Sequence, residues 1–265
     1  GYGASESVNV QLGTSTFVTL MTSVTNTKGS ASTSFTTPEA FKGAYTVKGV
    51  GVTSTGTAQA TFNIVPTIAL SPSTGKVGTN MSVKLRGFAP SEVVTLKWYD
   101  NLTATTLNTS TATALGSVTV TIPVPQAFKG THKVEAVGGA GNTVFMNYTV
   151  QPSVALSPTM GMVGSSVTVT LRGYDPNETI AVKWYALVSG VSTPTTLGTA
   201  TADAKGSATN LLEVDHKVDA AKLTFKVNGQ DVHSMDAAGL ALDGIVGIRA
   251  NHNLDLHVEG FDVHR

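Results

Sequence analysis

The sequence predicts an all-β protein built from tandem β-sandwiches, and three observations support this prediction. Blocks of sequence recur 86 residues apart, as when Lys97-Trp98-Tyr99 returns as Lys183-Trp184-Tyr185. Apolar and polar residues alternate over short segments, which is typical of half-buried strands. Thr, Ser, Gly and Val dominate while charged residues make up only 13% of the chain, a composition that disfavours helices. A fixed repeat of this length indicates an array of domains.

The charge and cysteine content excludes several classes of function. Lys and Arg number 17, as do Asp and Glu, so the chain has no excess charge to attract nucleic acid or an anionic membrane. It contains no cysteine, which excludes disulfides, thiolate catalysis and cysteine zinc sites. No apolar run is long enough to cross a membrane as a helix. The absence of Cys together with abundant Ser and Thr is typical of exported bacterial proteins.

The first repeat, residues 1–65, is predicted to be a partial sandwich. Its residues align with the second half of the following repeat, but it lacks a block equivalent to residues 66–86, which should supply the leading strands. A sandwich without those strands exposes apolar faces and open edges. Either the chain is a fragment of something longer or a partner fills the gap. Both termini fit cleavage after arginine, and arbitrary ends are the alternative.

The middle repeat, residues 66–151, is predicted to be a complete sandwich of seven short strands. Val94, Leu96 and Trp98 alternate with polar residues, as expected for a strand with one buried face. Segments rich in Gly and Pro at 71–75, 89–92 and 138–141 indicate turns between strands. Strands at this spacing favour two packed sheets. We expect Trp98 and its counterpart Trp184 to lie in the cores of their repeats.

Three sequence blocks resemble bacterial immunoglobulin-like repeats of large exported surface proteins. They are Leu-Ser-Pro-x-x-Gly-x-Val-Gly, Leu-Arg-Gly-Phe/Tyr-x-Pro-x-Glu and Pro-x-Ala-Phe-Lys-Gly-x-x-x-Val, and the resemblance covers residues 1–214. It implies tandem immunoglobulin-like sandwiches, with Trp98 at the place of a buried strand-C tryptophan. It also implies an extracellular, cell-surface location. Repeats of this kind serve as stalks, spacers and adhesive modules, so the resemblance does not choose among these tasks.

The third repeat begins at residues 152–214 like the middle one but does not finish like it. In residues 215–265 the composition changes, and five of the six histidines lie there. This C-terminal β region resembles the closing strands of concanavalin A-like and laminin-G-like jelly rolls, although it is too short to form a complete jelly roll. We expect its strands to complete the third sandwich or to pair with another subunit.

Two sets of residues could hold a metal ion. Asp255, His257 and Glu259 share one face of a predicted strand, and a histidine flanked by carboxylates could bind Zn²⁺. The alternative is a solvated strand face whose charges discourage edge pairing. Asp236 and Asp243 could contribute to a Ca²⁺ site, but the spacing of a calcium loop is missing. We therefore expect no cofactor, with Ca²⁺ or Zn²⁺ left open.

Tyr99 and Tyr185 are candidate sugar-binding residues because they occupy the outward parity beside Trp98 and Trp184. A flat aromatic ring can stack on the apolar face of a pyranose. The alternative is a cross-strand pair that stiffens the sheet. A recurring glutamate, Glu6, Glu92 and Glu178, follows a turn and is expected to cap it rather than to act as an acid or base.

Together these features predict a non-enzymatic extracellular structural protein, a subunit of a cell-surface filament, sheath or stalk. We expect it to assemble head to tail with itself, a C-terminal strand of one subunit completing the open first repeat of the next. The alternative function is a carbohydrate-binding or accessory module of a secreted polysaccharide-active enzyme or adhesin. We expect neither nucleic acid nor a membrane span as partner, while surface glycans remain a candidate ligand.

Overall fold

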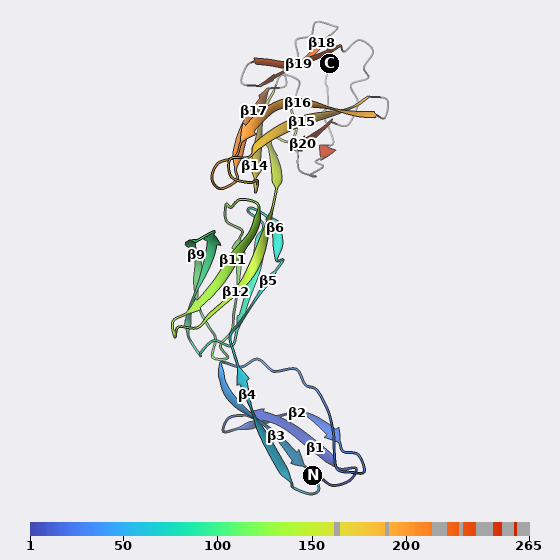
Figure 1. Ribbon diagram of the computed structural model, residues 1–265, viewed down its shortest axis with the longest axis vertical. Helices are drawn as coiled ribbons and strands as arrows, with labels where there is room; N and C mark the ends of the chain where they lie inside the picture. The colour runs from blue at the N-terminus through green and yellow to red at the C-terminus, as the bar shows by residue number, and fades with distance from the viewer. Residues whose placement is uncertain are drawn as a thin grey trace. The chain divides into compact units, whose positions relative to one another are not determined.

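Every regular element that the structure describes is a β-strand, which confirms the all-β prediction (Figure 1). The computed structural model describes residues 1–161, 165–188, 191–213, 222–227, 230–236, 246–250 and 257–258. Within these residues no helix is long and apolar enough to span a bilayer.

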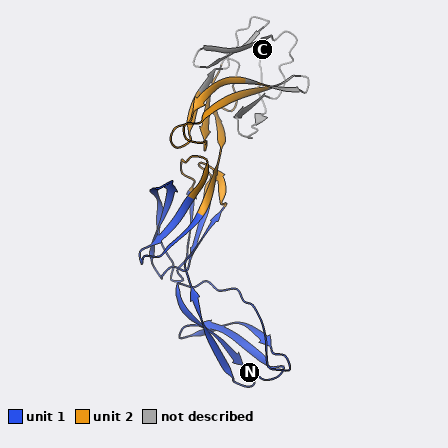
Figure 2. Ribbon diagram, in the orientation of Figure 1, with its two compact units in different colours: residues 1–71, 82–122, 133–146 blue, residues 72–81, 123–132, 147–265 orange. Residues whose placement is uncertain are grey.

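The chain divides into two compact units, and the division passes through the middle repeat (Figure 2). Compact unit 1 combines residues 1–71, 82–122 and 133–146. Compact unit 2 combines residues 72–81, 123–132 and 147–265. Each compact unit therefore holds one junction between consecutive repeats.

The first repeat forms one antiparallel sheet of four strands in the order β2-β1-β3-β4. The strands are β1 (Ser7–Gly13), β2 (Phe17–Val24), β3 (Gly43–Gly51) and β4 (Thr57–Ile64). Val8 and Leu12 on β1 are each only 5% exposed, as the alternation of the sequence predicts. The segment between β2 and β3 contains no strand. No second sheet covers this one among the residues of the first repeat, all of which the structure describes.

The middle repeat forms two sheets, in the orders β10-β7-β5 and β6-β12-β11-β8-β9. Its strands are β5 (Thr67–Ser71), β6 (Thr74–Lys76), β7 (Asn80–Arg86), β8 (Val93–Asp100), β9 (Thr103–Thr111), β10 (Val118–Pro123), β11 (Gly130–Gly138) and β12 (Thr143–Gln151). Inward-facing side chains of both sheets are buried, Val83 on β7 being fully buried and Trp98 on β8 1% exposed. No disulfide crosses this core, so apolar burial holds it together.

The turn predicted over residues 71–75 is limited to residues 72–73, where the chain bends after β5, because residues 74–76 form an additional strand that the sequence did not predict. Strand β6 pairs in parallel with the end of β12, Gly75 lying opposite Val150. A side chain at Gly75 would be only 2.5 Å from the Tyr148 hydroxyl, which explains the glycine. Strand β6 forms only because it pairs with β12, more than 70 residues later in the chain. The local composition, rich in Ser, Pro and Gly, indicates a turn and carries no sign of this pairing.

The third repeat also contains two sheets, in the orders β13-β14-β17-β18-β19 and β16-β15-β20-β21. Its first strands are β13 (Ser153–Ser157), β14 (Ser166–Arg172), β15 (Thr179–Val188), β16 (Val191–Thr201) and β17 (Ala208–Glu213). The strands of the C-terminal β region are β18 (Lys222–Val227), β19 (Gln230–Asp236), β20 (Val246–Ala250) and β21 (His257–Val258). Those strands join the sheets of the third repeat through β17 and β15. Trp184, 8% exposed, lies in the core cluster of this repeat.

A β-bulge occupies the same place in all three repeats. The register shifts between Val10 and Gln11 on β1, between Leu96 and Lys97 on β8, and between Val182 and Lys183 on β15. A β-bulge bends a strand and increases its twist, so equivalent bulges give equivalent strands the same bend. The first repeat therefore keeps the local geometry of the complete repeats although its second sheet is missing.

Candidate functional site

The side of the first repeat that carries β4 is more exposed than the equivalent side of the middle repeat. Phe62 on β4 is 36% exposed, whereas its counterpart in the middle repeat, Tyr148 on β12, is fully buried. The next inward position shows the same difference, since Ile64 is half-buried while Val150 is 1% exposed. In the middle repeat the sheet β10-β7-β5 accompanies this burial, and the first repeat has no equivalent sheet.

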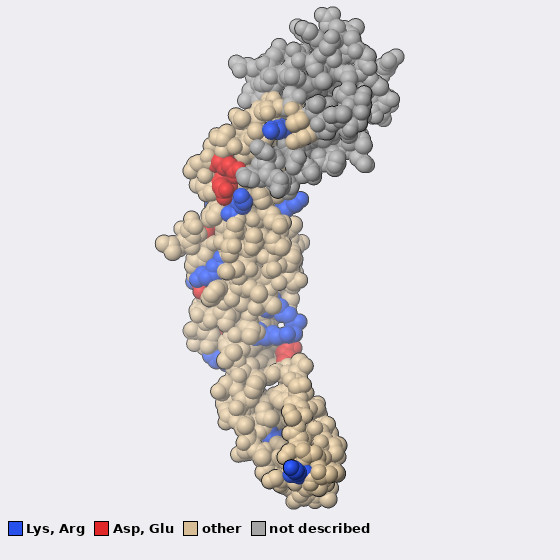
Figure 3. Space-filling view, turned by 45° about the vertical axis from the view of Figure 1, so that its right-hand side comes forward, with Lys and Arg blue, Asp and Glu red and all other residues tan. Residues whose placement is uncertain are grey.

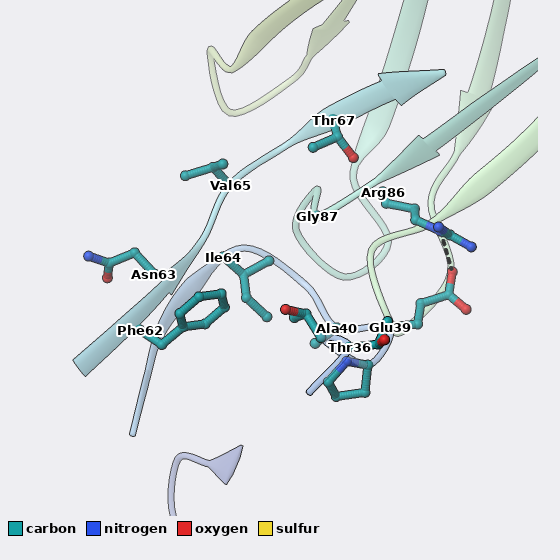
Figure 4. Close-up of a pocket in the computed structure, with 12 residues that line it drawn as sticks. Thr36, Glu39, Ala40, Phe62, Asn63, Ile64, Val65, Thr67, Arg86 and Gly87 are labelled. Carbon is teal, nitrogen blue, oxygen red and sulfur yellow. Dashed lines mark ion pairs between the residues drawn. The ribbon is translucent and has the colours of Figure 1, made fainter. Parts of the chain in front are cut away.

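A cavity of about 410 Å³ lies beside strand β4, entirely within compact unit 1 (Figure 4). One wall is residues 62–65 at the end of β4, and the opposite wall is residues 36–40 of the strandless segment. Thr67, Arg86 and Gly87, at the start of the middle repeat, complete the lining. Arg86 Nε lies 4.0 Å from Glu39 Oε1 in an exposed ion pair at the rim, a contact that contributes little stability. One side of the cavity is therefore the edge strand β4, whose Phe62 and Ile64 make that wall apolar.

The Ala-Phe-Lys-Gly segment joins each repeat to the next through the same backbone contact. In compact unit 1, Lys42 N–H donates to the carbonyl oxygen of Phe88 at 3.2 Å. In compact unit 2, Lys129 N–H donates to the carbonyl oxygen of Tyr174 at 3.0 Å. The second junction adds an ion pair of 3.6 Å between Lys129 and Asp175. The two junctions are therefore equivalent and recur with the repeat.

In each junction segment, the residue four positions after the phenylalanine has a ring that contacts it. The Tyr45 hydroxyl donates to the Phe41 carbonyl oxygen at 3.2 Å, and His132 Nε2 lies 2.8 Å from that of Phe128. The rings also pack, with centroids 6.0 Å apart in the first pair and 4.7 Å apart in the second. Sequence reasoning found the recurring Phe-Lys-Gly block but missed its role at the junction, although its recurrence was the available signal.

The recurring glutamates hold backbone N–H groups at turns. Glu6 accepts from the N–H groups of Gly3, Thr53 and Ser54. These bonds, that from Ser54 above all, lower the pKa of Glu6 to about 2 although burial opposes the shift. Glu92 accepts from Ala89 and Ala140 at 2.7 and 2.9 Å.

The pKa of Glu92 is likewise lowered. Burial acts to raise it, but the bonds from Ala89, Ala140 and the Asn142 amide together with the charge of Lys42 outweigh that effect. Both carboxylates therefore cap turns through backbone N–H groups, and these hydrogen bonds favour the ionised form.

Tyr99 lies in a cross-strand cluster on the outer face of the middle repeat. Its backbone is opposite Lys133, whose ammonium is 3.8 Å from the Tyr99 ring centroid and 2.9 Å from Glu135 Oε1. The Tyr99 hydroxyl donates to the other oxygen of Glu135. This hydrogen bond raises the pKa of Tyr99 and lowers that of Glu135. A sugar would have to displace Lys133 to stack on the covered ring face.

The environment of Tyr185 differs from that of Tyr99. The residue opposite Tyr185 on β20 is Gly247, which has no side chain to make the equivalent contact. The sugar-binding role of both tyrosines stays a prediction.

The side chains of all the predicted metal ligands lie outside the part of the chain that the structure describes. Asp255 and Glu259 are outside the described residues, as are Asp243 and the side chains of His257 and Asp236. Within the described part of the chain, no group of three acidic or histidine residues could hold a metal ion. Charged side chains also occupy little of the face shown in Figure 3.

The sequence matches no protein-family model and no curated protein. Among solved structures, it is similar to a tetra-tandem repeat from the extending region of a large adhesion protein, with 18% identity, 89% of this chain and 67% of that chain covered, and a TM-score of 0.27. It is also similar to a structure of a 1.5-MDa bacterial ice-binding adhesin, with 17% identity, 89% of this chain and 85% of that chain covered, and a TM-score of 0.22. The similarity to macromomycin has 17% identity, covers 33% of this chain and 100% of that chain, and has a TM-score of 0.29. Likeness at these scores defines no function for this chain.

Proposed function

We propose that this chain is a non-enzymatic structural protein of the cell surface, in which immunoglobulin-like repeats are joined end to end. Its first repeat is completed by β-strands from a neighbouring copy, so that subunits assemble head to tail. The open sheet of the first repeat carries this proposal. Val8 and Leu12 of this sheet are buried, but its edge strand β4 carries the partly exposed Phe62. A free edge with an exposed apolar side chain is a template for added strands.

The side-chain chemistry of the described residues supports a structural role. Glu6 and Glu92 have lowered pKa values because they bind turn backbone, and Glu135 because it binds Tyr99 and Lys133. A carboxyl that serves as a general acid or base at neutral pH has a pKa raised toward the working pH. The pKa values of Glu6, Glu92 and Glu135 are lowered instead, which favours a structural role for these three carboxylates.

The C-terminal region is the first donor to test. Leu254, Leu256 and Val258 alternate with polar residues as Met81, Val83 and Leu85 do on β7, a strand whose equivalent the first repeat lacks. Among the described residues, β21 pairs with β20, Val258 lying opposite Val246 and His257 opposite Gly247. A donated strand would exchange this pairing for one on the next subunit.

Electron microscopy and sedimentation of the full chain, compared with a variant lacking residues 251–265, test the proposal. We expect regular polymers from the full chain and monomers from the deletion variant. Circular dichroism and Trp98 fluorescence should show that the middle repeat stays folded in both. Polymers that persist in the deletion variant would exclude this donor, and a full chain that stays monomeric at every concentration would refute the assembly.

A further inference from the structure

Two strands near the points where the chain enters and leaves the middle repeat pair with each other in parallel. Strand β6 follows the first strand of the repeat and runs beside the end of β12, with Thr74 opposite Thr149 and Lys76 opposite Gln151. Gln151 ends β12, and the first strand of the third repeat begins at Ser153. The chain on either side of the middle repeat is therefore connected to one parallel pair, the β6–β12 pair.

Further backbone hydrogen bonds hold the segment that contains β6 at both of its ends. Before β6, the N–H of Thr149 donates to the carbonyl oxygen of Ser73 at 3.0 Å. After β6, the N–H of Gly78 donates to the Val124 carbonyl oxygen, and Val124 N–H donates to that of Thr79, both at 2.9 Å. All of these groups belong to compact unit 2.

Buried side chains surround this contact. Tyr148 on β12 is fully buried, Val150 is 1% exposed, and Val124 is 2% exposed. Hydrogen bonds next to buried side chains are stronger than those in water, because the local dielectric constant is lower. No disulfide crosses the repeat, so none can carry a load in place of these bonds.

The direction of the two strands decides how tension along the chain acts on them. A pull toward the N-terminus acts on the beginning of β6, and a pull toward the C-terminus acts on the end of β12. Because the strands are parallel, the two pulls act in opposite directions along the pair, and its hydrogen bonds are loaded together. In the antiparallel pair of β8 and β9, Val93 lies opposite Thr111, so a pull on these two ends would break the bonds one after another.

We propose that the middle repeat bears tension along the chain, and that the β6–β12 pair is the contact that resists its unfolding. This function goes beyond the proposed assembly. It does not depend on that assembly, because every group involved belongs to one repeat of one chain.

Single-molecule force spectroscopy of the full chain, held by its two ends, tests the inference. Thr149→Pro removes the N–H that binds Ser73, whereas Thr149→Ala keeps it. Forced unfolding follows the unfolding rate, so loss of one backbone hydrogen bond should speed unfolding of the middle repeat at constant force by roughly 2- to 12-fold. The alanine variant should unfold like the unmodified chain. The length of chain released identifies the middle repeat, residues 66–151, against the shorter first repeat, residues 1–65.

A variant outside the β6–β12 pair separates a mechanical role from a general loss of stability. Ile122→Val removes one buried methyl group from β10, which belongs to the sheet that contains neither β6 nor β12. Urea unfolding should show a loss of stability similar to that of Thr149→Pro. At constant force, however, Ile122→Val should speed unfolding less than Thr149→Pro does, because β10 is not part of the loaded pair.

A glycine variant keeps the test possible if Thr149→Pro does not fold, which Trp98 fluorescence would reveal. Gly78 has a φ of +86°, and no atom lies within 4 Å of a Cβ built there. Gly78→Ala therefore strains the turn after β6 without a clash and should speed forced unfolding by roughly 5- to 30-fold.

Two results would overturn the inference. One is equal unfolding rates at constant force for the Thr149→Pro and Thr149→Ala chains, or for Gly78→Ala and the unmodified chain where the proline variant does not fold. The other is an effect of Ile122→Val as large as that of the variant in the β6–β12 pair. Neither result bears on head-to-tail assembly, which the deletion of residues 251–265 tests separately.

Discussion

The four strands of the first repeat's sheet recur in the middle repeat, whose sheet adds β6 as a fifth strand and is accompanied by a second sheet. Both sheets have the same strand arrangement, the same bulge and the same glutamate-capped turn. Only in the middle repeat does a second sheet accompany the burial of Tyr148, whose counterpart Phe62 is partly exposed. The local structure of the sheet is therefore independent of a partner sheet. Val8 and Leu12 are buried without one, and the difference in burial is seen on the strand that carries Phe62 or Tyr148.

The largest effect is expected when the missing block is supplied in the same chain. Fusing a copy of residues 66–86 directly before Gly1 recreates the Arg86-Gly87 connection of the middle repeat. Burial of several apolar side chains should stabilise the first repeat by about 5 kcal/mol or more. Calorimetry of the fusion and of a scrambled-block control measures this gain, and equal unfolding temperatures would contradict the account.

Alanine substitutions at one equivalent position should have unequal effects in the two repeats. Tyr148→Ala should destabilise the middle repeat by about 3–5 kcal/mol, the range for buried aromatic residues. Phe62→Ala should cost about 1–2 kcal/mol, because part of the side chain is already exposed. Urea unfolding followed in each repeat checks the pair. Equal losses would mean that the first repeat is as closed as the middle one.

A pair of glycine substitutions separates the turn from the junction. Gly29 and Gly116 have φ values of +70° and +71°, and a Cβ on either would clash with a backbone carbonyl oxygen of its own repeat, that of Tyr2 or that of Phe88. At Gly116 a Cβ would also lie 2.9 Å from Cα of Phe41 in the preceding repeat. We expect each alanine variant to lose about 2 kcal/mol, with the larger loss for Gly116→Ala.

Thermal unfolding of the two glycine variants measures the difference, which is the contribution of the junction contact. A larger loss for Gly29→Ala would contradict the junction described at Phe41 and Phe88.

The smallest effect concerns acid stability, which should depend on the glutamate caps. The pKa of Glu6 falls from 4.5 to about 2 on folding. Its contribution is therefore complete above pH 4.5 and is lost as the pH falls toward 2. Glu6→Gln should reduce the pH dependence of first-repeat stability in this window, as measured by circular dichroism. An unchanged pH profile would show that the cap carries no charge-dependent stability.

The elements were predictable from the sequence where they depend on neighbours along the chain. The alternation of Val94, Leu96 and Trp98 predicted β8 and its buried face, and the Gly- and Pro-rich segments at 89–92 and 138–141 marked turns. Strand β6 could not be predicted, because it forms only against the distant end of β12.

The candidate site shows the same limit of sequence reasoning. The missing leading block predicted an open first repeat, but the cavity beside β4 depends on where residues 36–40 lie. The contact of Lys133 with the Tyr99 ring depends on the register between β11 and β8. Such pairings are set by tertiary packing, which local patterns do not report.

Amide hydrogen exchange on the full chain, as monomer and as polymer, tests the central claim most directly. In the monomer, residues 57–64 should exchange faster than residues 143–151, because β4 is an exposed edge strand whereas β12 lies between β6 and β11. In the polymer, the exchange of residues 57–64 should slow to the rate of their counterparts. Equal protection of β4 and β12 in the monomer would contradict the proposal that β4 is unprotected in the monomer and is completed by strands from a partner.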